Sequence, residues 1–365
     1  YNGLSGKSKD DFGQGSDRFI TYMNVYKNTI AAPDGCELVL VEDGEHQNRV
    51  EYGDILFTQS SETLEEVGLS SVWLHKASPF LNSFCFGFHF AGKEMINPRF
   101  IAYSLRTSYM REKIIREGQG ATRYNLSSNR LKPIKLVYPS YQEQSRIASL
   151  MSRLETRIEK QQELICTLKK YKRGLHKLVF VTKRKPFWEK LSLHDIASFC
   201  GGGTPSKDVS SYWEGEIGWI SSSDIQEEWI DDISVTRRIT KAAIDNSATK
   251  LCPEGTIAIV SRVGVGKVAI MPESLCTSQD FINIISITGN KHYMAYQIAF
   301  RMKLEAMKTQ GTSIKGVTAD TIKAMVLDIP LLDEQKKIAD ILTAFDSYIK
   351  KAVCELDLFL AMKKA

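Results

Sequence analysis

Two stretches of the chain carry apolar residues at steps that alternate between four and three. One series begins at Ile147 and the other at Ile338, 191 residues later. Steps of four and three are the heptad pattern of helices that pack along each other. The pattern predicts two long antiparallel helices that bury each other's apolar seam; the alternative is two helices that pack on separate cores. The predicted seam consists of Ile147, Met151, Leu154, Ile158, Ile165, Leu168, Ile338, Leu342, Phe345, Ile349, Leu356 and Phe359.

The chain repeats itself beyond these helices. Gln144 matches Gln335 at the same spacing of 191 residues, and Asn97 matches Asn290 at a spacing of 193. Earlier matches drift to a spacing of 200, as small loop insertions would produce. An ordered series of matches indicates two copies of one architecture. Each copy is predicted to contain a globular unit followed by a long helix.

Within the globular parts, short β-branched runs bounded by Gly and Pro predict strands. The predicted strands of the second copy, and the helix that follows them, cover residues 218–221, 256–261, 267–271, 281–287 and 293–308. Thr318 and Ser127 are predicted N-caps of equivalent short helices. Trp188 opens a further strand whose counterpart would fall before Tyr1, so we expect the first copy to lack its front strand.

These elements predict an α/β fold with α+β heads: two tandem similar domains separated by two long antiparallel coiled-coil helices. The predicted segments are a first domain over 1–142, a long helix over 143–183, a second domain over 184–333 and a second helix over 334–365. No apolar run approaches the roughly 20 residues that span a bilayer, so no membrane partner is expected. Seven scattered cysteines without a CxxC pair argue against disulfides or structural zinc and favour a cytoplasmic setting.

Positive charge is concentrated in one segment. The net charge of the chain is +5, but residues 143–185 hold 12 Lys and Arg against 4 Asp and Glu. The parts before and after this segment are close to neutral. A basic helix suits either a nucleic acid or an acidic protein surface, and the charge alone leaves both possibilities open.

The sequence holds no recognisable catalytic or metal-binding motif. The six histidines form no HExxH pattern, and no GxSxG sequence occurs. Arg262–Lys267 is rich in glycine, but Val268 follows where a phosphate-binding loop has Ser or Thr, so we predict a glycine turn that can face DNA. Asn97-Pro98 only partly resembles the Asn-Pro-Pro-Tyr/Phe motif of DNA amino-methylating enzymes, and we predict that it begins a helix instead.

Two loops at equivalent places precede the short capped helices. They span Gln119–Asn125 and Gln310–Gly316, and each carries small hydroxyl or amide groups together with one basic residue. These groups suit contacts to phosphates and to base edges. An ordinary turn followed by a helix cap explains them equally well.

Taken in order, these motifs resemble the specificity subunit of type I restriction–modification systems over essentially the whole chain. The residues that carry the resemblance are Gly201–Ser206, Trp219–Asp224, Arg262–Lys267, Gln310–Ser313 and Ile329–Gln335. The resemblance implies a non-catalytic subunit with two target-recognition domains, each of which reads one half of a split DNA sequence. It also implies that the helices set the spacing of the half-sites and dock the methyltransferase subunits.

The resemblance further implies the partners and the site residues. The expected partners are double-stranded DNA, two DNA methyltransferase (modification) subunits and restriction/translocase subunits, with S-adenosylmethionine and ATP bound only by those subunits. Two alternatives remain, a protein scaffold that does not read DNA and the recognition half of a fused restriction enzyme. The candidate DNA-binding residues are Lys7, Tyr22, Asn24, Gln59, Ser60, Arg123, Tyr124, Asn125, Lys207, Ser221, Ser222, Ser223, Arg262, Lys267, Thr312, Ser313 and Lys315.

Overall fold

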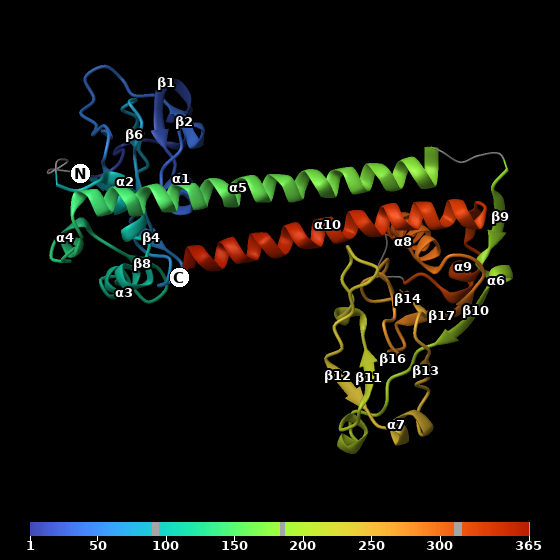
Figure 1. Cartoon of the computed structure of the whole chain (residues 1–365). Helices are drawn as coiled ribbons and strands as arrows, with labels where there is room; N and C mark the ends of the chain where they lie inside the picture. Colours follow the sequence, from blue (N-terminus) through green and yellow to red (C-terminus); the bar gives the residue numbers. More distant parts are fainter. Residues whose placement is uncertain (90–94, 183–186, 310–315, 365) are drawn as a thin grey trace. The chain divides into compact units, whose positions relative to one another are not determined.

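The computed structural model describes residues 1–89, 95–182, 187–309 and 316–364. The chain divides into two compact units, each built around its own globular part (Figure 1). The residues of unit 1 are Tyr1–Lys160 and Asp357–Ala365, and those of unit 2 are Gln161–Leu356. Each unit therefore contains one globular part and a portion of both long helices. The predicted fold, two similar domains of mixed helices and sheets with two long helices, is confirmed.

Two three-stranded sheets form the globular part of unit 1, with the strand orders β2-β1-β6 and β5-β3-β7. In the first sheet β1 pairs antiparallel with β2 and parallel with β6, whereas the pairs of the second sheet are antiparallel. The elements of this part are β1 (Phe12–Ile20), α1 (Tyr22–Lys27), β2 (Cys36–Val39), β3 (Ile55–Thr58), β4 (Ser60–Ser61), β5 (Ser70–Val72), β6 (Phe80–Leu81), β7 (Cys85–Phe88), α2 (Pro98–Ser104), α3 (Ser108–Arg116), β8 (Tyr124–Asn125) and α4 (Ser128–Leu131).

Two four-stranded sheets form the globular part of unit 2, with the orders β10-β17-β14-β15 and β12-β11-β16-β13, and β18 pairs with β9. Here β11 pairs antiparallel with β12 and parallel with β16. The elements are β9 (Glu189–Ser192), α6 (Leu193–Ile196), β10 (Ala197–Gly201), β11 (Ile217–Ile220), β12 (Arg237–Ile239), α7 (Lys241–Asp245), β13 (Leu251–Cys252), β14 (Ile257–Val260), β15 (Val268–Ile270), β16 (Leu275–Thr277), β17 (Phe281–Ile287), α8 (Lys291–Thr309), α9 (Ala319–Lys323) and β18 (Val326–Ile329).

The two globular parts share one topology. The sheet β2-β1-β6 corresponds to β12-β11-β16, and β5-β3-β7 corresponds to β15-β14-β17. Each of the two β1-type sheets contains a parallel pair, β1–β6 in unit 1 and β11–β16 in unit 2. The strands of unit 2 predicted from β-branched runs are all present, and β17 has the predicted bounds.

The residues matched in the sequence make the same hydrogen bonds. The side-chain amide of Gln144 accepts from the N–H of Asn97 (2.8 Å) and donates to the carbonyl of the proline five residues earlier (2.9 Å). In unit 2, Gln335 accepts from Asn290 (2.8 Å) and donates to the equivalent proline (2.8 Å). Each glutamine ties the start of a long helix to the start of a helix of the globular part. The repeat is therefore structural as well as sequential.

The short helices differ in how they begin. Thr318 accepts a hydrogen bond from the N–H of Thr321 (3.2 Å) and so caps α9, as predicted. Ser127 is the N-cap residue of α4, as predicted, but its side chain makes no capping hydrogen bond. Asn97 accepts from two N–H groups in the first turn of α2, which confirms a helix start at this motif.

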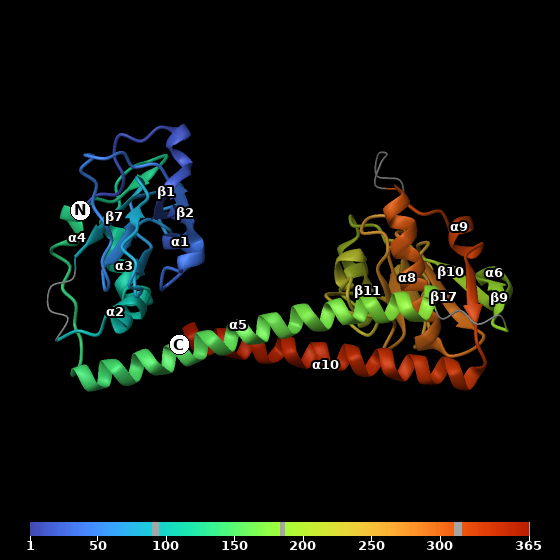
Figure 2. The same cartoon turned by 90° about the horizontal axis from the view of Figure 1, so that it is seen from above.

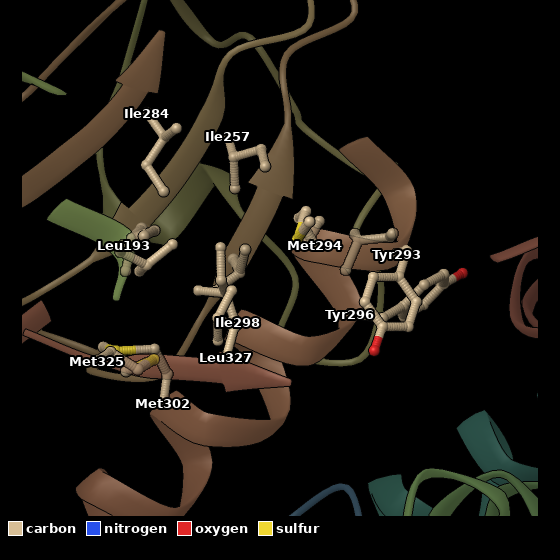
Figure 3. Packing of buried hydrophobic residues seen from close by; sticks show 14 of the residues in the cluster. Leu193, Ile257, Ile284, Tyr293, Met294, Tyr296, Ile298, Met302, Met325 and Leu327 are labelled. Atoms are coloured by element: carbon tan, nitrogen blue, oxygen red, sulfur yellow. The ribbon is translucent and has the colours of Figure 1, made fainter. Parts of the chain in front are cut away.

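The core of unit 2 contains a residue that has no counterpart in the described part of unit 1. Leu193, at the start of α6, is fully buried next to the strands that carry Ile257 and Ile284 (Figure 3). The described residues of unit 1 include no equivalent of β9 or α6. The corresponding core has an apolar groove of about 250 Å³ there, lined by Ile55, Phe57, Phe88, Leu105, Met110, Ile114, Leu131, Lys132, Ile134 and Leu136.

Truncating Leu193 to alanine is expected to lower the free energy of unfolding by about 2–5 kcal/mol, because it leaves a cavity in a close-packed core. Urea denaturation followed by tryptophan fluorescence measures the loss. His194 is the exposed neighbour, and His194→Ala should change the free energy of unfolding by less than about 0.5 kcal/mol. Equal losses for the two variants would contradict the placement of Leu193 in the core.

The two long helices run antiparallel within unit 2, where they lie side by side in both views (Figures 1 and 2). Gln161 donates to the carbonyl of Ala352 (2.9 Å), and Lys172, farther along the first helix, pairs with Asp346 (2.6 Å). The seam between the helices holds Ile165, Leu168, Phe345, Ile349, Ala352, Val353 and Leu356. The helices, and the π-helical turn that ends the first, are α5 (Tyr141–Lys177), Leu178–Thr182 and α10 (Leu332–Lys364).

Three predicted seam positions lie elsewhere. Ile147 is 37% exposed and does not belong to a buried seam. Ile338 and Leu342 pack into the main core of unit 2, because the first turns of α10 lie against its globular part. In unit 1 the two helices meet again, where the guanidinium of Arg157 lies 5.2 Å from the ring centroid of Phe359.

His176, near the end of α5, is half-buried and packs against aromatic rings. The ring centroids of Phe180 and Tyr296 each lie 5.8 Å from its own. Burial, aided by the positive charges of Lys172 and Lys303, lowers the pKa of His176 to about 3. The imidazole is therefore neutral in the folded unit, whereas in the unfolded chain it takes up a proton near pH 6.5.

Stability should accordingly fall as the pH falls from about 6.5 toward 4, because over this range the unfolded chain binds a proton that folded His176 does not. The loss amounts to at most about 1.4 kcal/mol per pH unit. Melting temperatures measured across this range should fall less steeply for His176→Phe than for the wild-type chain. His194→Phe, at an exposed position, is the matched control. Parallel curves for wild type and His176→Phe would contradict the prediction.

Candidate nucleic-acid interface

In unit 1 the predicted loop residues meet at a two-stranded sheet. β4 pairs antiparallel with β8, so that Ser60 lies opposite Asn125. The carbonyl of Gln59, just before β4, accepts a hydrogen bond from the N–H of Leu126 (2.8 Å), just after β8. Gly120 gives the loop before β8 a φ of 138°, which favours glycine. Two segments far apart in the sequence are thereby brought together with their predicted residues Gln59, Ser60, Arg123, Tyr124 and Asn125.

A pocket of about 450 Å³ opens beside this sheet. The hydroxyl of Tyr22 donates to the carbonyl of Ser60 (2.7 Å), and its ring stacks on that of Tyr26 at 6.0 Å. Burial raises the pKa of Tyr22, so its hydroxyl remains a hydrogen-bond donor at neutral pH. The other lining residues are Met23, Ser61, Glu62, Glu66, Phe84 and Arg123.

The exposed side chains around this pocket suit contacts with a nucleic-acid duplex. Gln59, Arg123 and Asn125 are exposed. A guanidinium group binds phosphate or the edge of guanine, and a side-chain amide binds the edge of adenine with both of its polar atoms. The cluster therefore combines a group that can hold the backbone with groups that can distinguish bases.

Two predicted residues of unit 1 serve the fold instead. Lys7 pairs with Glu45 at 2.5 Å and its side chain is only 5% exposed; hydrogen bonding to Lys7 is the main cause that lowers the pKa of Glu45 to about 2. Asn24 is buried, donates to the carbonyl of Ala32 (2.8 Å) and accepts from its N–H (3.0 Å). Neither side chain is accessible to DNA in this fold, so the predictions for Lys7 and Asn24 are wrong.

In unit 2 the turn after β11 is fixed by one buried carboxylate. Asp224 accepts hydrogen bonds from the N–H of Ser221 (2.7 Å), the hydroxyl of Thr236 (2.8 Å) and the guanidinium of Arg237 (2.6 Å). Burial alone would raise the pKa of Asp224, but these hydrogen bonds outweigh it and lower the pKa. The hydroxyl of Ser221 is held inside the turn, whereas Ser223 is exposed.

The glycine turn between β14 and β15 reaches the same place. The ammonium of Lys267 donates to the carbonyl of Ser222 (2.8 Å), which joins the two turns. Gly264 and Gly266 have φ angles of 82° and 104°, which confirms the predicted turn. Arg262 is exposed at the start of this turn. Lys267 is thus a positioning residue for the neighbouring turn, and Arg262 presents its charge to the surface.

The second predicted loop of unit 2 ends beside Arg262. The N–H of Val317 donates to the carbonyl of Ser261 (2.8 Å), just as Leu126 donates to Gln59 in unit 1. Lys207 is exposed in the loop that follows β10. Three predicted residues of the loop over Gln310–Gly316 lie outside the described residues; they are Thr312, Ser313 and Lys315.

Some residues of these clusters were not found from the sequence. Arg237 binds Asp224 and lies 4.6 Å over the ring of Trp219, so it holds the turn after β11 in place. In the sequence, Arg237 could have been identified only as a charged residue on a strand next to the predicted serine turn. Met23 and Phe84 at the first pocket could not be identified from the sequence, because the type of an apolar residue does not show whether its side chain is exposed.

The part of the basic segment that belongs to unit 2 is partly neutralised by ion pairs. Lys169 pairs with Glu228 (2.7 Å) and Lys172 with Asp346 (2.6 Å). The exposed cations of α5 are Arg146, Arg153, Arg157, Lys160, Lys170, Arg173 and Lys177. These cations lie along the helix outside the two loop clusters, so they suit an acidic partner surface as well as DNA.

Among residues 1–89, 95–182, 187–309 and 316–364 no group of three or more His, Cys, Asp or Glu side chains is arranged to hold a metal ion. Over the same residues, no helix has the length and apolar character needed to cross a membrane.

A family model matches the chain twice. The model described as the type I restriction modification DNA specificity domain matches residues 26–169 and again residues 187–354. The first match begins after β1 and covers the rest of the globular part of unit 1, and the second covers the globular part of unit 2; each also includes most of the long helix that follows. The two matches thus coincide with the two copies of the repeat.

Curated relatives agree with this match. The chain is 34% identical to the MjaIX type I restriction enzyme specificity subunit of Methanocaldococcus jannaschii, over 45% of this chain and 39% of the relative. It is 31% identical to the EcoR124I/EcoR124II specificity subunit of Escherichia coli, over 43% and 40%. The chain therefore matches about two fifths of the length of these two relatives. It is 26% identical to the putative MjaX specificity subunit of M. jannaschii over 96% of this chain and 84% of that one.

Solved structures show the same fold. The S subunit of a type I restriction–modification system from M. genitalium has a TM-score of 0.59 and 15% identity, over 100% of this chain and 90% of that chain. The HsdS subunit from Thermoanaerobacter tengcongensis has a TM-score of 0.51 and 12% identity, over 95% and 88%.

Proposed function

Because the chain belongs to the family defined by the type I restriction modification DNA specificity domain, we propose that it is the DNA-recognition subunit of a type I restriction–modification complex. Each globular part reads one half of a bipartite DNA site. The observation that carries the proposal is the duplicated domain, which presents an exposed polar loop cluster at the equivalent place in each copy.

The two clusters supply the chemistry that recognition of a duplex needs. In unit 1, Arg123 holds phosphate or guanine while Gln59 and Asn125 read base edges. In unit 2, Arg262 and Ser223 have these roles. The turns are held by buried polar groups, so little conformational freedom is lost when DNA binds.

The helices provide a spacer and a docking surface. A helix of 37 residues is about 55 Å long, and a continuous helix that enters both units suits a ruler for the half-sites. Both helices also carry exposed apolar side chains at intervals of seven or fourteen residues outside the seam. These are Leu150 (67% exposed), Leu164 (39%) and Tyr171 (63%) on α5, and Ile341 (55%), Tyr348 (59%) and Met362 (56%) on α10.

Two such rows, related by the repeat, favour two equivalent partners. Leu150 corresponds to Ile341 and Tyr171 to Met362, each 191 residues apart. Exposed apolar rows are typical of protein–protein contact surfaces. We assign them to two DNA methyltransferase subunits, which the restriction/translocase subunits join in the cytoplasm. The chain itself acts without catalysis, and S-adenosylmethionine and ATP are bound by the partner subunits.

The proposal is tested by DNA selection with the chain and its methyltransferase subunits. A random-sequence pool is bound, the retained fraction is sequenced, and the experiment is repeated across salt concentrations. We expect two short blocks separated by a fixed gap. Retention without an enriched sequence, with binding that fades as salt rises, would contradict the proposal and favour a scaffold that does not read DNA.

A further inference from the structure

The turns that lead into β7 and β17 are equivalent in their hydrogen bonds. The N–H of Phe84 in unit 1 is held by the side chain two residues before it (2.9 Å), and so is the N–H of Asp280 in unit 2 (3.3 Å). The carbonyl of Phe84 accepts a hydrogen bond of 2.8 Å from the N–H of Gln59, which directly follows β3. The carbonyl of Asp280 accepts one of 2.8 Å from the N–H of Ser261, which directly follows β14. Phe84 and Asp280 therefore occupy the same position in the two copies.

The turns after β1 and β11 correspond in the same way. The N–H of Asn24 donates to the carbonyl of Thr21 (3.1 Å), and the N–H of Asp224 donates to the carbonyl of Ser221 (3.0 Å). The third residues, Met23 and Ser223, are therefore equivalent. In unit 1, Met23 and Phe84 line the pocket beside β4 and β8. In unit 2, Ser223 follows the residue whose carbonyl binds Lys267, and the carbonyl of Asp280 binds the N–H of Ser261, next to Arg262.

The two units carry opposite chemistry at these positions. In unit 1 both side chains are large and apolar, and Met23 is 47% and Phe84 58% exposed. In unit 2 a hydroxyl is exposed at Ser223 and a carboxylate is half-buried at Asp280. The backbone hydrogen bonds of these turns correspond, so the side chains differ in what each unit presents to a ligand.

We propose that positions 23/223 and 84/280 determine which bases each unit prefers, an inference that rests on the proposed function. In the major groove thymine alone presents a methyl group, which apolar side chains contact, whereas Asp accepts a hydrogen bond from the amino group of cytosine. Met23 and Phe84 accordingly favour thymine in one half-site. Ser223 and Asp280 favour a base with an amino group, cytosine above all, in the other.

DNA selection with the full chain and its methyltransferase subunits tests this inference. Phe84→Asp should replace a thymine by cytosine at one position of one block, with a change in relative enrichment on the order of ten-fold. Asp280→Phe should make the reverse change in the other block only. Tyr109→Asp is the matched control, because Tyr109 is also 58% exposed but lies on α3 outside the pocket; it should leave both blocks unchanged.

The outcomes separate this inference from the proposed function. A wild-type chain that enriches no split motif would overturn the proposed function. A wild-type motif that persists unchanged in Phe84→Asp and Asp280→Phe would overturn this inference alone. Weaker binding without a changed base preference would also overturn it. Melting temperatures establish that each variant is folded, and Phe84→Asn and Asp280→Leu provide milder forms of the same exchange should the first variants unfold.

Discussion

Replacing Ile349 with aspartate is expected to separate α5 from α10 in unit 2 and to lower the free energy of unfolding by more than about 4 kcal/mol. Ile349 is fully buried in the seam with Ile165 and Leu168. A carboxylate at this place would lose its hydration among apolar side chains. Urea denaturation followed by circular dichroism measures the loss of stability and of helix.

Two control variants separate the effect of packing from that of position. Ile349→Val keeps an apolar side chain in the seam and should lower the free energy of unfolding by about 0.5–1.5 kcal/mol. Tyr348→Asp places the same carboxylate one residue earlier, where the side chain is 59% exposed. It should retain wild-type stability but weaken capture of the methyltransferase subunits. An Ile349→Asp protein as stable as the wild type would contradict the antiparallel helix pair.

Asp346→Ala is expected to lower the free energy of unfolding by about 3–5 kcal/mol, because it leaves Lys172 buried without its partner. The carboxylate and the ammonium lie 2.6 Å apart, with side chains 5% and 14% exposed, and Asp346 also accepts from the hydroxyl of Tyr296 (2.9 Å). Burial lowers the pKa of Lys172 and raises that of Asp346 despite their contact. Each ion is thus costly to bury, and the ammonium that remains would keep a hydrogen bond to the carbonyl of Glu228 (2.6 Å) but no opposite charge in the helix seam.

The repeat supplies a control for this prediction. In unit 1, Lys363 pairs with Glu155 (2.6 Å), which also accepts from the hydroxyl of Tyr103 (2.8 Å), but the two charged side chains are 37% and 21% exposed. Glu155→Ala should therefore lower the free energy of unfolding by about 1 kcal/mol or less. The double variant Lys172→Met, Asp346→Leu should regain most of the stability that Asp346→Ala loses. Equal losses for Asp346→Ala and Glu155→Ala would show that burial does not decide the effect.

The helices and sheets were predictable because they depend on the local spacing of apolar residues. The surface against which each apolar face packs does not depend on that spacing. Ile338 and Leu342 continue the heptad series but are covered by the globular part of unit 2. A seam and a domain contact require the same kind of residue, so spacing alone cannot distinguish them. Gln161 and Lys172 interrupt the series as polar residues, and only the structure shows the carbonyl and the carboxylate that satisfy them.

The candidate site was predictable where the repeat aligned its loops and unpredictable where distant residues intervene. Arg123 and Asn125 were found because their loop has a counterpart before α9. Lys7 was mistaken for a DNA contact because its partner Glu45 lies 38 residues away, and nothing local reveals the ion pair. Asn24 was mistaken because a polar side chain on a short helix can face either solvent or backbone. The base-reading residues of a loop depend on exposure, which follows from the tertiary structure.

If each unit reads its own half-site, selective damage to one cluster should alter only one half of the recognised sequence. The chain carrying Gln59→Ala and Asn125→Ala, both exposed in unit 1, is bound with its methyltransferase subunits to a random DNA pool beside the wild type. We expect one block of the motif to become degenerate, while the other block keeps its sequence. Equal degeneration of both blocks, or a motif unchanged in both, would contradict two independent readers.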